Sequence, residues 1–245
     1  MLLLSRIWLS SRMLRVDLSL SNDFSSKSGF SNGHGAMPSV RMDPQRQGYQ
    51  QRSPVLIVYN LDIARFNCQK LFNLMSLYGN VNKINFIRSK EGCAMVEFAS
   101  SQSSLEALKL LNNIFVFGNR INVEESRKMF VEEIRSPYDL PSGDKSFENF
   151  IGDRNNRFNT PQQASKNRLL PPNKTLHFYN VPKMEDDAMM DIFCDANAPF
   201  PTKVTWFDLK SFSVVMPKDK ILEALSILTS DSFAPTATEF SLSEC

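Results

Sequence analysis

The sequence predicts an α+β protein in which one β-α-β-β-α-β order of elements occurs twice, behind a polar N-terminal arm. Residues 54–126 alternate apolar runs of strand length with segments of helical period, in that order. Residues 174–245 repeat the order more faintly, and a repeat of a whole module is stronger evidence than either copy alone. Residues 1–53 and 127–173 are less regular.

The first module, residues 54–126, contains each element that this order requires. Residues 55–59 form a β-branched and apolar run that predicts a buried strand. Leu71, Leu74, Met75 and Tyr78 recur at helical spacing within a helix predicted over 67–78. The other elements are strands over 81–88, 93–98 and 115–123, and a helix over 103–111 with Ser103 and Glu106 spaced as a capping box. This is the ferredoxin-like βαββαβ fold, in which helices cover one sheet face and leave the other open.

The second module, residues 174–245, is predicted to have strands over 176–181, 203–208, 211–216 and 238–242, and helices over 186–196 and 218–228. In the strand 203–208, Val204 and Trp206 face inward and Thr205 faces outward with Phe207. The register of the next strand is open, since one alignment places Phe212 on the open face and the other places it in the core.

The segments outside the modules differ in character. Residues 21–53 are rich in Ser, Asn, Gly and Gln, so we expect residues 1–53 to be a disordered arm. Residues 1–20 carry three arginines and one acid, which fits a mitochondrial transit peptide or an atypical start. The linker 127–173 holds Phe147, Phe150, Ile151 and Phe158, which we expect to pack between the domains on their helix faces. A short helix is predicted over 161–167, capped by Thr160.

Composition excludes several function classes. The net charge of +2 cannot hold a polyanion by itself, so a nucleic-acid site requires local clustering of basic residues. Four scattered cysteines without a CxxC pair and two histidines argue against a metal site, and no cofactor is expected. No run approaches the roughly 20 apolar residues of a membrane helix. The absence of a Gly-rich phosphate loop or an HExxH motif argues against an enzyme.

The most informative stretch is Lys90–Phe98, which holds the predicted third strand of the first module and the end of the turn before it. Gly92, Ala94, Val96 and Phe98 match the scaffold positions of the RNP1 strand of an RNA-recognition motif (RRM). Cys93 and Met95 stand where RNP1 has its two stacking aromatics, and Ile57 stands at the stacking position of the partner strand, RNP2. The pattern therefore predicts an RRM whose open face binds RNA without the usual aromatic pair.

The predicted RNA-binding residues follow from the strand alternation. The open face of the first module presents Ile57, Lys83, Asn85, Ile87, Met95 and Asn122, with the basic residues Arg88, Lys90, Arg120, Arg127 and Lys128 at its rims. The second module offers His177 at its RNP2 stacking position, with Thr205, Phe207 and, in one register, Phe212. Each basic residue alone is more often a solvated surface charge, but their clustering around one face favours RNA.

Several blocks make the chain similar to the heterogeneous nuclear ribonucleoprotein L family, relatives of polypyrimidine-tract-binding protein. They are residues 53–59, 78–81 and 94–97 and, most specifically, the linker block 154–161 with 166–168. The resemblance covers about residues 53 to 245. It implies two RRMs equivalent to the last two of four, with aliphatic residues at the stacking sites. It also implies modules packed through helices and linker, a nuclear location, and binding to CA-rich single-stranded RNA in splicing regulation beside other ribonucleoproteins or splicing factors. The chain departs from the family in lacking the first two RRMs, and its second module has no RNP1 glycine.

Two alternatives remain open at this point. The modules could serve as a protein-interaction scaffold that uses its helix faces, since the second module is degenerate. The transit-like residues 1–20 could instead mark a mitochondrial RNA-binding isoform.

Overall fold

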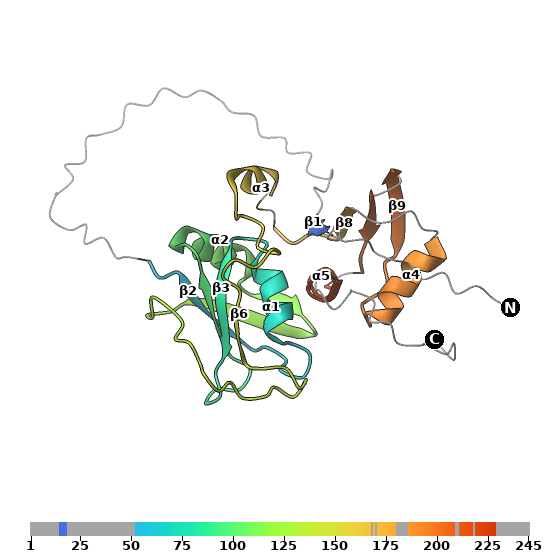
Figure 1. The fold of residues 1–245 in the computed structure, drawn as a ribbon. Coiled ribbons are helices and arrows are strands. Elements are labelled where there is room, and N and C mark those ends of the chain that lie inside the picture. The colour runs from blue at the N-terminus through green and yellow to red at the C-terminus, as the bar shows by residue number, and fades with distance from the viewer. Residues whose placement is uncertain are drawn as a thin grey trace, which may run out of the picture.

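The computed structural model of the chain describes residues 15–18, 52–167, 169, 171–179, 186–208, 211–217 and 219–228. They form two α+β modules side by side, each with helices on one face of an antiparallel sheet (Figure 1). The predicted fold class is confirmed. No described helix is long and apolar enough to span a membrane.

The first module forms a sheet that is wider than predicted. Its elements are β2 (Val55–Tyr59), α1 (Cys68–Met75), β3 (Val81–Phe86), β4 (Ala94–Phe98), α2 (Ser101–Leu111), β5 (Ile114–Val116), β6 (Asn119–Glu125) and β7 (Phe147–Asn149). The sheet order is β5-β6-β2-β4-β3-β7. The predicted strand 115–123 is a hairpin of β5 and β6, because Phe117 and Gly118 both take positive φ angles and reverse the chain. Strand β7 comes from the linker and pairs with β3.

Local sequence sets the helix starts. The Asn67 side chain caps α1 by accepting a hydrogen bond from the Lys70 amide at 2.8 Å. Helix α2 begins at Ser101, two residues before the predicted start, because Ser100 accepts from the Ser103 amide at 3.1 Å. The predicted pairing of Ser103 with Glu106 is wrong, since Glu106 forms an ion pair with Lys109 at 3.0 Å.

The backbone conformation and close packing at Gly92 explain why RNP1 has a glycine at this position. Its φ is +70°, in the region that favours glycine, and an added Cβ would lie 3.0 Å from the Leu61 carbonyl oxygen. The Leu61 amide donates to the Gly92 carbonyl at 2.9 Å. This close approach joins the end of β2 to the start of β4.

The second module has a four-stranded sheet in the order β1-β8-β10-β9. Its elements are β1 (Arg15–Leu18), β8 (Thr175–Tyr179), α4 (Asp186–Asp195), β9 (Lys203–Asp208), β10 (Ser211–Val215) and α5 (Ile221–Leu228). Its core includes Phe178, which stacks on Phe212 with centroids 4.6 Å apart, and Phe193. The strand predicted over 238–242 lies outside the described residues.

Strand β1 corrects the expectation that the whole N-terminal arm is disordered. It pairs antiparallel with β8, with Arg15 opposite Tyr179 and Leu18 opposite Leu176. In the first module the corresponding edge, beside β2, is held by β6, the last strand of the same module. The sequence 15–18 alternates polar and apolar residues, which suits an edge strand, but its partner lies far away along the chain.

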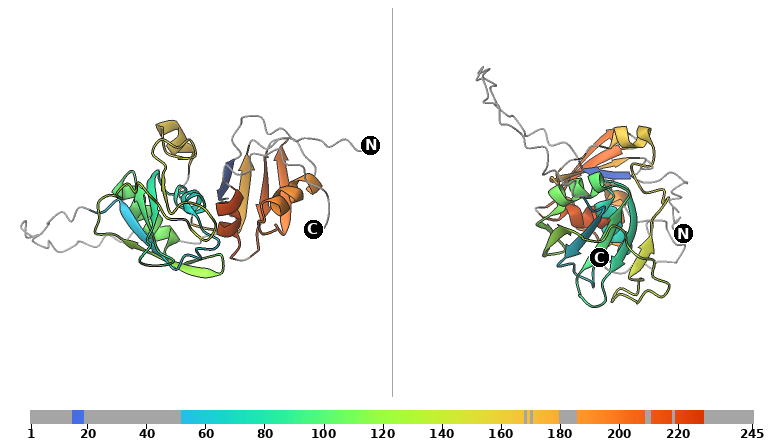
Figure 2. Two further views of the ribbon diagram at one scale, coloured as in Figure 1. Left: turned by 60° about the horizontal axis from the view of Figure 1, so that its bottom comes forward. Right: turned by 90° about the vertical axis from the view of Figure 1, so that its left-hand side faces the viewer.

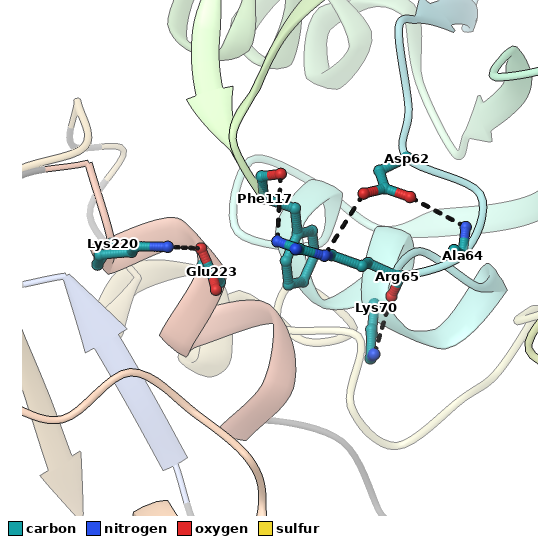
Figure 3. A network of polar contacts seen from close by, with 7 residues as sticks. All are labelled: Asp62, Ala64, Arg65, Lys70, Phe117, Lys220 and Glu223. Atoms are coloured by element: carbon teal, nitrogen blue, oxygen red, sulfur yellow. Dashed lines mark hydrogen bonds and ion pairs between the residues drawn. The ribbon is translucent and has the colours of Figure 1, made fainter.

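The two modules pack through α1 and α5, which lie between the sheets (Figure 2). The buried Asn73 of α1 donates from Nδ2 to the Ser226 carbonyl of α5 at 2.8 Å, and accepts from Gln69 at 3.2 Å. Figure 3 shows the nearby face, where Lys220, just before α5, pairs with Glu223 of α5 opposite Arg65 and Phe117 of the first module. Because both helices cover inner sheet faces, the open faces point away from this contact.

The linker block 154–161, which carries the family resemblance, is tied to the first module. Asn156 is buried, and its side chain accepts from the Val81 amide at 2.9 Å and donates to the Val81 carbonyl at 3.0 Å. The Phe158 amide donates to Asn80 Oδ1 at 2.9 Å. Short helix α3 (Pro161–Lys166) follows, with Thr160 as its cap in a capping box with Gln163, as predicted for the cap.

We expect Asn73→Ala to weaken the contact between modules. It removes the donor to the buried Ser226 carbonyl, and leaving such a group unpaired costs about 1–3 kcal/mol. Urea denaturation should show this loss, and ¹⁵N relaxation should show the modules tumbling more independently. The control is Gln102→Ala, at an exposed position of α2, which should change neither; equal effects of the two variants would contradict the proposed role of Asn73.

We also expect β1 to stabilise the second module. Replacing both Val16→Gly and Leu18→Gly should lower its free energy of unfolding by roughly 1–2 kcal/mol, since glycine in a strand interior costs about 0.5–1 kcal/mol at each position. Hydrogen exchange of the β8 amides measures the effect. Leu2→Gly with Leu4→Gly, a loss of the same kind outside the strand, is the control, and unchanged protection of β8 in the first variant would show that β1 is dispensable.

Candidate nucleic-acid interface

The open face of the first module is built around one row of side chains that crosses four strands. Ile57 of β2 lies opposite Met95 of β4, which lies opposite Asn85 of β3, which lies opposite Phe147 of β7. Since side chains alternate along a strand, this row faces away from Leu56, Ile84 and Val96 in the core. The row is apolar apart from Asn85.

A second group continues the face toward the loops at the ends of β2 and β3. Tyr59 lies opposite the exposed Asn122 of β6. The half-buried Ile87 donates its amide to the Cys93 carbonyl at 2.8 Å. Burial and the carboxylate of Glu124 raise the pKa of Tyr59, and burial raises the pKa of the Cys93 thiol. Both groups therefore stay neutral at pH 7 and add no negative charge that would repel phosphate.

The other end of the face is covered by residues 126–133, which we call the strap. Ser53 Oγ donates to the Lys128 carbonyl at 2.5 Å, and the Val131 amide donates to Glu97 Oε2 at 2.6 Å. Val131 is fully buried against Val55 and Met95. The strap thus runs from the end of β6 across β2 and β4 and is anchored at its centre.

The strap changes the roles of three predicted residues. Met95 is only 9% exposed, because Val131 covers part of it. Lys83 Nζ lies 3.5 Å from the Val131 carbonyl oxygen and 3.7 Å from Glu133, so its charge is turned to the strap and not to the open face. Lys128 pairs with Glu132 at 3.3 Å within the strap, where Arg127 is exposed.

The four linker residues predicted to pack between the domains have different places. Phe150 does pack under the helices, stacked on Phe72 of α1 with centroids 4.2 Å apart. Phe147 is instead a half-buried member of the open face, because β7 extends the sheet. Ile151 is 62% exposed, and Phe158 is half-buried beside Asn80. Packing between the modules therefore rests on α1 and α5, with Phe150 behind α1.

The basic rim residues rest on aromatic rings. Lys90 Nζ lies 4.4 Å from the Tyr59 ring centroid, and the Arg120 guanidinium lies 4.4 Å from that of Phe115. Arg120 also donates to Asn113 Oδ1 at 2.9 Å. Arg88 lies 5.8 Å from the ring of Tyr138. Cation–π contacts hold these side chains while they stay exposed, so Arg88, Lys90 and Arg120 surround the uncovered part of the face.

The open face of the second module carries an aromatic pair. The rings of His177 on β8 and Phe207 on β9 lie 5.3 Å apart and are tilted by 50°. Phe207 is 59% exposed, and Thr205 is exposed on the same strand. Strand β10 lies between β8 and β9, and its Ser213 lies opposite both His177 and Thr205. Phe212 does not belong to this face: it is buried against Phe178 and Trp206, which settles the open register in favour of the core.

Two features of the face could not be found by sequence reasoning. Phe147 follows no periodic pattern that indicates a strand, because β7 has only three residues and depends on the β3 edge. Val131 ends the short apolar run Met129–Val131, and nothing in the sequence singles it out as the residue of the three that is buried on the sheet. Among the described residues, no group of three or more His, Cys, Asp and Glu could hold a metal ion.

The family is shown by comparison with known proteins. The model of the RNA recognition motif (also called the RRM, RBD or RNP domain) matches residues 29–153, and a second RRM-domain model matches residues 166–229. The first match alone covers half of the chain. The chain therefore belongs to the RNA recognition motif family.

Curated relatives confirm the resemblance noted from the sequence. Heterogeneous nuclear ribonucleoprotein L of Mus musculus is 42% identical over 160 residues, covering 65% of this chain and 27% of the relative. The Homo sapiens protein of that name is 40% identical over 187 residues, covering 76% and 31%. Polypyrimidine tract-binding protein homolog 3 of Arabidopsis thaliana is 26% identical over 206 residues, covering 83% and 45%. The chain thus spans less than half the length of these relatives.

The solved structures that the chain matches include the Rna15 RRM with bound RNA (GU). It is 21% identical and covers 32% of this chain and 88% of its own, with a TM-score of 0.29. The Sxl-lethal protein/RNA complex is 20% identical and covers 71% and 87%, with a TM-score of 0.28.

The strap should depend on Val131. Val131→Ser removes its buried side chain from Val55 and Met95, and losing the burial of a valine costs roughly 2 kcal/mol. Denaturation should show this loss, and trypsin should cleave after Arg127 or Lys128 faster than in the unaltered chain. The exposed Met129→Ser is the matched control. If both variants keep the stability and cleavage rate of the unaltered chain, the strap is not anchored by Val131.

Proposed function

We propose that this chain binds single-stranded RNA through the open sheet faces of its two RRMs and acts in the regulation of splicing and mRNA processing. The observation that carries the proposal is the row Ile57–Met95–Asn85–Phe147 on an RRM sheet, an apolar strip with one amide group. The basic side chains Arg88, Lys90 and Arg120 lie at the rim of this face, and Glu124 of β6 lies opposite Ile57. Bases of single-stranded RNA bind this kind of surface, with phosphates at a basic rim.

Phe147 gives the face an aromatic ring that the RNP1 sequence lacks. It lies at the β7 end of the row, and stacking of a base on an aromatic ring is worth roughly 1–3 kcal/mol. Ile57 and Ile87, both half-buried, offer aliphatic cover for neighbouring bases. The first module can thus bind bases without aromatics at Cys93 and Met95.

Asn85 is the group on this face best suited to discriminate between bases. Its side-chain oxygen is buried and has no hydrogen-bond donor among the described residues. An amide oxygen can accept from the exocyclic amino group of cytosine or adenine, which uracil lacks. Rotation of the Asn85 side chain on binding would satisfy this acceptor, whose burial without a donor costs free energy. This chemistry agrees with a preference for CA-rich RNA, which the family resemblance implies.

The second module is proposed to bind RNA through His177 and Phe207. Histidine and phenylalanine both stack on unpaired bases, and the two rings are close enough to hold one base each or to share one. Thr205 adds a hydroxyl to the same strand. The open faces point apart, so one RNA would have to loop around the modules to reach both.

The relatives extend the proposal to cellular context. Heterogeneous nuclear ribonucleoprotein L is by name a nuclear ribonucleoprotein, so we propose a nuclear location and association with other ribonucleoproteins or splicing factors. The helix-face scaffold gains less support, because α1 and α5 pack on each other. Residues 15–18, part of the transit-like segment, lie in β1.

The proposal is tested by fluorescence anisotropy of the full chain with a CA-repeat RNA, a uridine-rich RNA and a scrambled control, at two salt concentrations. We expect CA-repeat RNA to bind most tightly and to lose affinity as salt rises, since phosphate contacts release counterions. Asn85→Ala should lower the preference for CA over uridine more than it lowers total affinity.

Asn82→Ala is the matched control, since Asn82 lies on the same strand and its side chain donates to Glu97 at 3.3 Å. Failure of the unaltered chain to bind any of the RNAs would refute the proposed function. If the Asn85 and Asn82 variants prefer CA-repeat over uridine-rich RNA to the same extent, Asn85 does not discriminate between bases.

A further inference from the structure

Phe130 is an exposed aromatic on a segment that is otherwise held firmly. Its side chain is 61% exposed, while the next residue, Val131, is fully buried on the sheet. The backbone on either side is fixed by the hydrogen bonds of the Lys128 carbonyl to Ser53 and of the Val131 amide to Glu97. The ring is therefore presented to solvent by a positioned backbone and not by a loose loop.

Phe130 is the most exposed of the four phenylalanines that are largely exposed within the described part of the chain; the others are Phe115, Phe207 and Phe200, which precedes β9. Burying a phenylalanine is worth about 1.5–3 kcal/mol, so an exposed one gives up that stabilisation. Phe115 is covered by the Arg120 guanidinium, and Phe207 lies against His177. Phe130 has neither a ring partner nor a cation partner among the described residues, and its neighbour Met129 is also 40% exposed.

The position of Phe130 relates it to the proposed RNA face. The strap covers one end of that face, and Val131 touches Met95, a member of the central row. Because the strap crosses β2 and β4 beside the row, RNA that leaves the row toward this end of the strands would meet the strap. Arg127 and Lys128 precede Met129 and Phe130, which places the exposed charge of Arg127 close to apolar side chains, while Lys128 pairs with Glu132. This is the combination that binds single-stranded nucleic acid through phosphates and stacked bases.

We propose that Phe130 is a base-stacking subsite for an unpaired nucleotide of RNA just beyond the sheet face, with Arg127 holding its phosphate. This inference rests on the proposed RNA-binding function and adds to it a site outside the RRM sheet. The strap then has two roles, since Val131 fixes it to the sheet and Phe130 extends the surface available to RNA.

The test uses the full chain with CA-repeat RNAs of four and of ten nucleotides. Phe130→Leu keeps an apolar side chain but removes the ring, whereas Phe130→Trp keeps an aromatic ring. We expect the leucine variant to bind the longer RNA about tenfold more weakly, which corresponds to 1.4 kcal/mol, and to bind the shorter RNA unchanged. The tryptophan variant should keep its affinity, and its added fluorescence should be quenched by the longer RNA.

Ile151→Ala is the matched control, because Ile151 is exposed to the same degree, at 62%, outside the strap. If the unaltered chain binds RNA and the leucine variant binds each length with the same affinity as the unaltered chain, the subsite is refuted while the proposed function stands. A change in self-association by sedimentation, with RNA affinity unchanged, would also refute it and assign the ring to a protein contact. No RNA binding by the unaltered chain would refute both.

Discussion

The packing of α1 against α5 decides which surfaces of this protein are left for a ligand. Each helix covers the inner face of its own sheet, and the two meet around a buried hydrogen bond from Asn73 to the Ser226 carbonyl. A buried polar contact of this kind fixes orientation, because sliding the helices would leave both groups unpaired. The open faces are consequently turned outward, and α1 and α5 occupy each other's outer surfaces.

Within this arrangement, the linker completes the first module. It contributes β7, whose Phe147 lies in the central row of the open face. It also contributes the strap, whose Val131 covers the face over Val55 and Met95. Farther along, Asn156 binds both backbone groups of Val81 at the start of β3. A sheet that lacks RNP1 aromatics thus obtains its shape and an aromatic ring from residues outside the βαββαβ unit. The affinity of such a face cannot be judged from its RNP motifs alone.

The sequence predicted well those features that depend on local periodicity. Strand alternation placed Ile57, Asn85 and Ile87 on the open face, and the helices of both modules appear at the predicted positions within a few residues. The errors concern contacts between distant segments. Three-residue β7, strand β1 and Val131 have no periodic pattern of their own, since each depends on an edge or a surface formed elsewhere. The partners of Lys83, the Val131 carbonyl and Glu133, come from the strap and are unpredictable from periodicity for the same reason.

We propose that the open sheet faces, and not the helix faces, bind RNA. This proposal is best tested by amide chemical-shift mapping of the full chain during titration with a CA-repeat RNA. We expect the largest shifts on Asn85, Ile87 and Phe147 in the first module and on His177 and Phe207 in the second, with α1 and α5 unaffected. Shifts confined to the helices, or none at saturating RNA, would contradict it.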